Sequence, residues 1–117
     1  MEYLKEEEEA GKWCEDNYPE MTQEYKKIMM EQYILFFKKH RNYGTSNINV
    51  GTNLDTDSDV KLALTGIWFR LNDKIQRLRQ LVVNGEPDTV GESSLDTFQD
   101  LSVYGIIAQI VSQKKFK

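Results

Sequence analysis

The feature that most constrains the fold is an apolar stripe in the middle of the chain, over residues 59–83. Its members recur every three or four residues, the period of an α-helix and not of a strand. They are Val60, Leu64, Ile67, Leu71, Ile75, Leu78 and Val82. Apolar or small residues also lie on the opposite side of this helix, at Leu62, Gly66 and Phe69. A helix contacted on two sides belongs in the middle of a bundle or at a subunit boundary.

Two further helices complete the expected fold. The stretch from about Thr22 to Arg41 carries a wide apolar surface, and Thr22 is a candidate N-cap. A last helix, from about Glu92 to Ser112, becomes apolar on all sides in its second half, which is typical of a buried helix. No alternating strand pattern of useful length occurs. The sequence therefore predicts an all-α fold, a small helical bundle with three main helices and an N-terminal helix.

The length of 117 residues predicts one domain spanning residues 1–117. Residues 1–20 form an acidic N-terminal extension or helix around the run Glu6 to Glu9. Residues 42–58 are rich in Gly, Asn, Ser and Thr and predict a long loop. Loops above about 12 to 15 residues are uncommon in compact domains unless they are functional or disordered. This loop is therefore a candidate to contact a ligand.

Charge and composition exclude several classes of partner. The net charge of −4 argues against duplex nucleic acid, whose binding requires a basic surface, but it allows a small anionic ligand. No apolar span is long enough for a membrane helix, so we expect no membrane partner. Cys14 is the only cysteine, which excludes an internal disulfide and fits a reducing cytoplasm.

Three carboxylates are placed at intervals of four residues at the start of the last helix. Glu92, Asp96 and Asp100 would share one helical face, which continues into apolar residues one turn later. Charges on such a face are costly unless they are paired with cations or with a metal. Because Mg²⁺ prefers oxygen ligands, we predict these three residues as ligands of a magnesium ion.

Three cations flank the apolar stripe of the middle helix on one side, at Arg70, Lys74 and Arg77. With the acids on a facing helix, they could hold a nucleotide's phosphates while the metal polarises a phosphoryl oxygen. In that interpretation Asp73, Asp96 and Asp100 are the candidate catalytic residues. The alternative is that the acids and cations pair with one another as a buried ion network. The spacing favours neither alternative over the other.

Several motifs in order resemble a known family. They are Gly91 to Leu101 with Tyr104, Arg70 to Lys74 with Arg77 and Leu78, and Asn42-Tyr43-Gly44. Over about Ile34 to Val111 the chain resembles the nucleotide modification associated domain 1 family, small helical proteins common in phages. It is more distantly similar to the MazG-type all-α nucleotide pyrophosphohydrolases. Those enzymes carry two E-x-x-E/D pairs, whereas here the acids are spaced by four and the first pair is absent.

The resemblance favours a ligand site over a simple ion network. It implies a Mg²⁺-dependent, pyrophosphatase-like hydrolase of a nucleotide or modified nucleotide, in the host cytoplasm if the protein is phage-encoded. The missing acid pair keeps open a non-catalytic binder of a nucleotide or nucleotide-like signal, and the apolar helix faces keep open an oligomeric adaptor. The candidate nucleotide contacts are Lys39, Tyr43, Gly44, Asn47, Arg70, Lys74 and Arg77.

The middle helix also predicts self-association. Three helices in a small domain cannot easily cover both of its apolar sides. We therefore expect a homodimer or higher homo-oligomer, in which the face of Leu62, Gly66, Phe69 and Asp73 lies close to another chain. At the end of the chain, the basic tail Lys114 to Lys117 is expected to be solvated. His40 is expected to offset a helix dipole and to have no chemical role.

Overall fold

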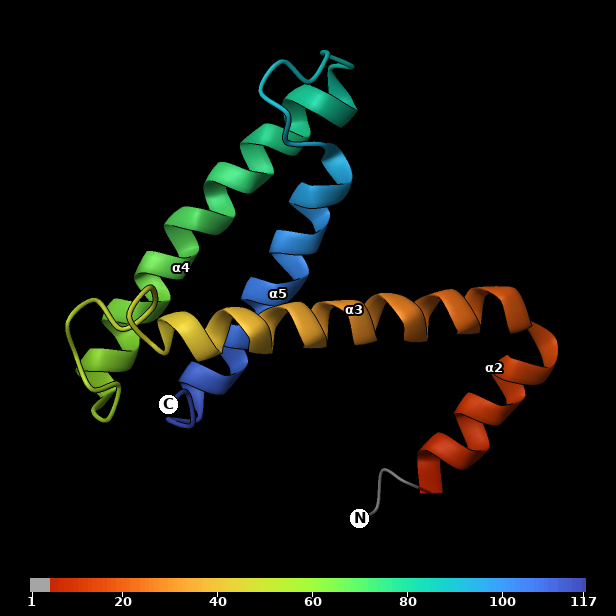
Figure 1. The fold of residues 1–117 in the computed structure, drawn as a ribbon, viewed down its shortest axis with the longest axis horizontal. Coiled ribbons are helices and arrows are strands. Elements are labelled where there is room, and N and C mark those ends of the chain that lie inside the picture. Colours follow the sequence, from red (N-terminus) through yellow and green to blue (C-terminus); the bar gives the residue numbers. More distant parts are fainter. Residues whose placement is uncertain (1–4) are drawn as a thin grey trace. The chain divides into compact units, whose positions relative to one another are not determined.

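The computed structural model describes residues 5–117, leaving out the side chain of Glu7. This part of the chain is helical and contains no strand (Figure 1). In order, the elements are the π-helical turn η1 (Glu7–Gly11), α2 (Lys12–Asn17), α3 (Pro19–Tyr43), α4 (Asp57–Leu78), the π-helical turn η2 (Arg79–Val83) and α5 (Ser94–Ser112). The predicted all-α class, with three main helices and an N-terminal helix, is confirmed. Residues 1–4 of the predicted acidic extension lie outside the described residues.

The chain forms two compact units that meet within α3. The N-terminal unit runs to residue 37, and the C-terminal unit comprises residues 38–117. Among residues 5–117, no helix is both long enough and apolar enough to cross a membrane.

In the N-terminal unit, α3 begins earlier than the sequence suggested. Pro19 is its first residue, a position where the fixed φ of proline suits a helix and its missing N–H costs nothing. The prediction of Thr22 as N-cap is therefore wrong. Thr22 lies inside the helix, and its hydroxyl donates a hydrogen bond to the Tyr18 carbonyl oxygen at 2.8 Å. An ion pair between Lys26 and Glu15 links α3 to α2.

In the C-terminal unit, α4 and α5 pack against each other. The N-cap of α4 is Thr56, whose hydroxyl accepts a hydrogen bond from the Asp59 N–H at 3.1 Å. Both helices contribute buried residues, and the remaining core members come from the loop before α4 and from the tail. The buried apolar residues are Ile48, Leu54, Ala63, Ile67, Ile107, Val111 and Phe116.

The connection between α3 and α4 is non-helical from Gly44 to Thr56, two residues shorter at each end than predicted. Gly44 ends α3 with a φ of 56°, a left-handed conformation that glycine adopts without strain. Ile48 and Leu54 are both buried, so the loop is anchored to the C-terminal unit at two points. This anchoring holds the polar backbone between them in a defined place.

The last helix begins two residues later than predicted, because Ser93 is its N-cap. The Ser93 hydroxyl accepts a hydrogen bond from the Asp96 N–H, and the Asp96 carboxylate accepts one from the Ser93 N–H, both at 3.1 Å. This reciprocal pair is a capping box. Glu92 therefore precedes the helix, and the expected ladder of three helical carboxylates contains only two helical members.

The tail is not the solvated end that the sequence suggested. Phe116 is only 4% exposed, and its ring meets that of His40 edge to face, with centroids 5.3 Å apart. The His40 ring also hydrogen-bonds the Lys117 carbonyl oxygen through Nε2. Lys114 pairs with Asp57 at 2.8 Å. The aromatic residue among the lysines supplies the apolar area that attaches the tail.

Replacing Ser93 with alanine removes the oxygen that caps α5. We expect Ser93→Ala to lower the free energy of unfolding by about 1 kcal/mol, the usual cost of losing an N-cap side chain. Urea titration followed by circular dichroism measures it. Ser94→Ala is the matched control, because Ser94 is the first residue inside the helix and does not cap it. Equal effects of the two substitutions would contradict this assignment of the cap.

Candidate functional site

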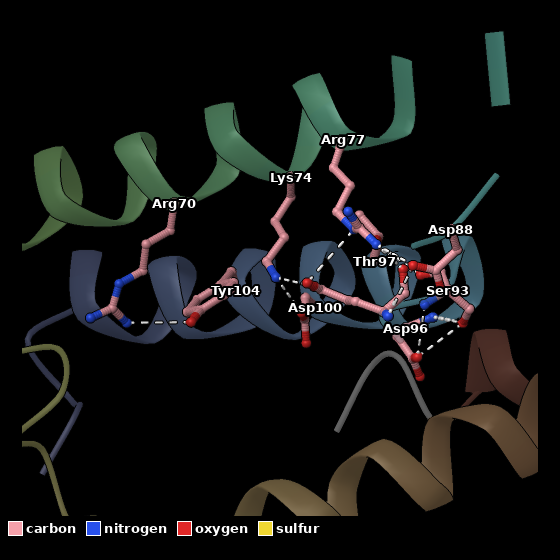
Figure 2. A network of polar contacts seen from close by, with 10 residues as sticks. Arg70, Lys74, Arg77, Asp88, Ser93, Asp96, Thr97, Asp100 and Tyr104 are labelled. Atoms are coloured by element: carbon pink, nitrogen blue, oxygen red, sulfur yellow. Dashed lines mark hydrogen bonds and ion pairs between the residues drawn. The ribbon is translucent and has the colours of Figure 1, made fainter. Parts of the chain in front are cut away.

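One face of α4 carries a row of three cations directed at α5 (Figure 2). Arg70, Lys74 and Arg77 are spaced by four and three residues, so their side chains leave the helix on one side. Figure 2 shows them spanning the space between the two helices, where carboxylates and a tyrosine meet them. The predicted facing arrangement of cations and acids is therefore present in the structure.

Lys74 is the centre of the row. Its ammonium contacts a carboxylate oxygen of Glu92 and lies 2.9 Å from Asp100 Oδ2. The side chain is 24% exposed, so the pairs are only partly screened by water. The hydrogen bonds that the ammonium donates to Glu92 and, after it, to Asp100 raise the pKa of Lys74 above its usual value. One cation thus neutralises two carboxylates that would otherwise repel each other.

Arg77 fixes the connection that leads into α5. Its Nη2 donates to Asp88 Oδ1 at 2.9 Å and to the backbone carbonyl of Glu92, while its Nε lies 3.7 Å from Glu92 Oε2. The same Asp88 carboxylate accepts the N–H groups of Val90 and Glu92. These hydrogen bonds, that from Val90 first, lower the pKa of Asp88. Arg77 and Asp88 together therefore hold the backbone that presents Glu92.

Arg70 differs from the other two cations because its partners are neutral. Its Nη1 donates to the Tyr104 hydroxyl at 3.3 Å, and its Nη2 donates to the Asn47 carbonyl oxygen at 2.8 Å. The guanidinium carbon also lies 5.6 Å from the centre of the Tyr104 ring. Within residues 5–117, no carboxylate lies within ion-pair distance of Arg70. This end of the row therefore keeps an uncompensated positive charge.

The candidate acids are not all brought together. Glu92 and Asp100 converge on Lys74, but Asp96 is used in the capping box with Ser93. Asp73 is exposed on α4 and makes no ion pair with any described residue. The described residues contain no group of three or more His, Cys, Asp or Glu side chains arranged to hold a metal. The magnesium site stays a prediction that rests on Glu92 and Asp100, with any further ligands coming from outside the chain.

Among the other predicted contacts, Asn47 is brought to the row through its carbonyl oxygen. Gly44 lies at the start of the same loop, whereas Lys39 and Tyr43 are exposed in the last turns of α3 and take no part in the polar network around the three cations among the described residues. The role of Asp88 was not predicted from the sequence. Its carboxylate accepts the N–H of the residue two positions later, which is an Asx turn, and its place beside Pro87 could have indicated this turn.

Comparisons with known proteins give no relative. No protein-family model matches the chain. No match was found among curated proteins, and none among solved structures. The resemblance to the nucleotide modification associated domain 1 family therefore stays a prediction from the motifs.

Replacing Lys74 with methionine tests the ion network. We expect Lys74→Met to destabilise the protein by about 1 to 2 kcal/mol at pH 7, because Glu92 and Asp100 lose the cation between them. Because the pKa of Lys74 is raised from 10.5 in the folded protein, its contribution to stability is present below that pH and is lost as the pH rises through the folded-state value. The deficit relative to wild type should therefore shrink as the pH is raised above 10.5.

Urea titrations at several pH values measure this difference. Lys61→Met is the control, because Lys61 is exposed on α4 and makes no ion pair among residues 5–117. A deficit for Lys74→Met that is independent of pH would mean that the side chain contributes packing and not charge.

Proposed function

We propose that this protein binds the phosphates of a nucleotide or modified nucleotide at the Arg70 end of the cation row. The observation that carries the proposal is the absence of any carboxylate beside Arg70 among residues 5–117. Structural ion networks satisfy their cations with acids, as Lys74 and Arg77 illustrate. A half-buried guanidinium held by neutral groups is the arrangement expected of an anion site.

The chemistry around Arg70 suits a phosphate. A guanidinium has five N–H donors, and only two bonds to neutral acceptors are made here. A phosphate oxygen is a stronger acceptor than the Tyr104 hydroxyl or the Asn47 carbonyl, and it can engage two donors at once. The Tyr104 ring beside the guanidinium limits its rotation. Lys74 lies one turn further along α4. It can reach a second phosphoryl group if it releases one of its two carboxylate partners.

We propose that Mg²⁺ accompanies the phosphates. This ion is usually held by one or two carboxylates together with substrate oxygens, so Glu92 and Asp100 are sufficient protein ligands. When bound, it would supply Lewis-acid chemistry at a phosphoryl oxygen. Hydrolysis is the catalytic form of the proposal, with Asp100 as the one of the three candidate catalytic acids that contacts the row and Asp73 and Asp96 as the further candidates. A binder without turnover is the simpler form.

We further propose that the protein works in the cytoplasm as a homo-oligomer. The lone Cys14 fits a reducing compartment. On α4, the predicted contact face includes Leu62 and Phe69, which are both exposed in the single chain. Exposed large apolar side chains grouped on one helix are typical of a contact surface.

The binding proposal predicts a loss specific to Arg70. A nucleoside triphosphate with Mg²⁺ should raise the melting temperature, since a ligand at about 100 times its Kd stabilises by about 2.7 kcal/mol. Arg70→Gln should abolish most of that shift. Lys61→Gln, which removes an exposed cation from the same helix, should retain it. Losses of equal size would indicate diffuse electrostatic attraction, and no shift with any nucleotide in wild type would refute the proposal.

The metal proposal predicts a loss specific to Asp100. Asp100→Asn keeps the shape of the side chain but removes a charge, so the increase in nucleotide affinity caused by Mg²⁺ should fall about tenfold or more. Isothermal titration with and without Mg²⁺ measures this increase. Asp73→Asn is the comparison for a candidate acid outside the network. Phosphate release, measured in the same samples, distinguishes a hydrolase from a binder.

A further inference from the structure

The helix α3 carries an apolar surface that its own unit leaves exposed. None of its 25 residues is buried. Nine large apolar side chains within residues 19–37 of this helix are exposed, among them Met21 at 61% and Tyr25 at 66%. They are Met21, Tyr25, Ile28, Met29, Met30, Tyr33, Ile34, Leu35 and Phe37. A surface of this size on one helix indicates a contact site for another protein chain.

The pattern along α3 is that of a helix that pairs with another helix. Met21, Tyr25, Ile28, Gln32 and Leu35 are separated by intervals of four, three, four and three residues. This is the alternation of a and d positions in a heptad repeat, in which side chains of one helix fill the spaces of a second. A polar residue at an a position, here Gln32, fixes the register between two helices at a cost in the stability of the pair.

The charges beside this seam determine the orientation. Glu24 and Lys38 occupy equivalent positions of the heptad, two repeats apart, with Glu31 between them. In a parallel pair, these g positions would lie beside the e positions of the other helix, which are the uncharged Thr22, Met29 and Phe36. In an antiparallel pair, Glu24 of one helix faces Lys38 of the other, twice by symmetry, and the two Glu31 side chains meet once near the axis. Cations near one end of α3 and acids near the other therefore favour antiparallel pairing.

We propose that α3 pairs antiparallel with α3 of a second copy of this chain. Tyr25 packs against Leu35 of the other copy, and Ile28 packs against Gln32. The seam takes its apolar area from Met21, Tyr25, Ile28 and Leu35, all exposed on one side of the helix, with Met29 at its edge. The inference shares with the proposed function only the assumption of a second copy, and it concerns neither Arg70 nor the α4 face.

Sedimentation at micromolar concentration tests whether the contact exists. The wild-type protein should have at least twice the mass of one chain. Leu35→Glu should raise the dissociation constant about 100-fold or more, because it places an unpaired charge in the seam. Val83→Glu is the control, since Val83 is 78% exposed and lies in the C-terminal unit. A monomeric wild type would overturn the proposal, and so would unchanged assembly of Leu35→Glu.

Phe69→Glu separates this contact from the α4 face. Loss of assembly in Phe69→Glu, with Leu35→Glu unaffected, would assign the contact to α4 and overturn the α3 pair. Nucleotide-induced stabilisation is measured on the same variants. Arg70→Gln should lose the nucleotide-induced stabilisation while the mass of the assembly in sedimentation is unchanged. The two proposals can therefore fail separately.

Crosslinking tests the orientation even if Leu35→Glu fails to fold. In a Cys14→Ser background, Glu31→Cys should crosslink to its own copy with a short bis-maleimide, because residue 31 lies near the two-fold axis of the antiparallel pair. Glu24→Cys alone should not crosslink. A mixture of Glu24→Cys with Lys38→Cys should give the heterodimer. Efficient crosslinking of Glu24→Cys to itself would indicate a parallel pair and overturn the proposal.

Discussion

The contact on which the candidate site depends is the bridge from Lys74 to Glu92 and Asp100. Glu92 comes from the connection before α5, and Asp100 comes from its second turn, so one ammonium joins α4 to two separate parts of the chain. Without a cation the two carboxylates would repel each other at partial burial. The bridge therefore ties α4 both to the connection before α5 and to α5 itself.

The two ends of the cation row differ in their partners. Toward Arg77 the nearby carboxylates are already paired, that of Asp88 with Arg77 and two backbone N–H groups, and that of Glu92 with Lys74 and Arg77. Toward Arg70 the partners are a carbonyl and a hydroxyl, which compensate no charge. The same face of α4 thus carries cations that are neutralised by acids and, two turns away, Arg70, which has no acidic partner among residues 5–117. The ion network predicted from the sequence describes the Lys74 and Arg77 part of this face, and the anion site at Arg70 stays a proposal.

The sequence predicted most of the fold because α4 and α5 are specified by local patterns. The stripe from Val60 to Val82 indicated one helix, and the structure ends it in the π-helical turn η2 at Val83. The errors occurred where a single side chain outweighs a pattern. Ser93 moved the start of α5 past Glu92, and Phe116 is buried although the three lysines around it are exposed. Neither periodicity nor charge counting detects one cap or one anchoring ring.

The facing cations and acids could be predicted because helical spacing places Arg70, Lys74 and Arg77 on one side. The pairing within the network could not, since spacing does not determine which acid reaches which cation.

Charge is divided unevenly along the chain, and this changes what the net charge of −4 implies. Up to residue 37 the sequence holds ten carboxylates and four lysines, whereas residues 38–117 hold eleven cations and nine carboxylates. The C-terminal unit, which carries the cation row, is therefore slightly basic, and the acidic excess belongs to the N-terminal unit. Because charges separated by more than about 10 Å are largely screened at 0.1 M salt, a ligand at Arg70 responds to the charges close to it more than to the net charge of the whole chain. An anionic ligand at Arg70 is thus compatible with an acidic protein.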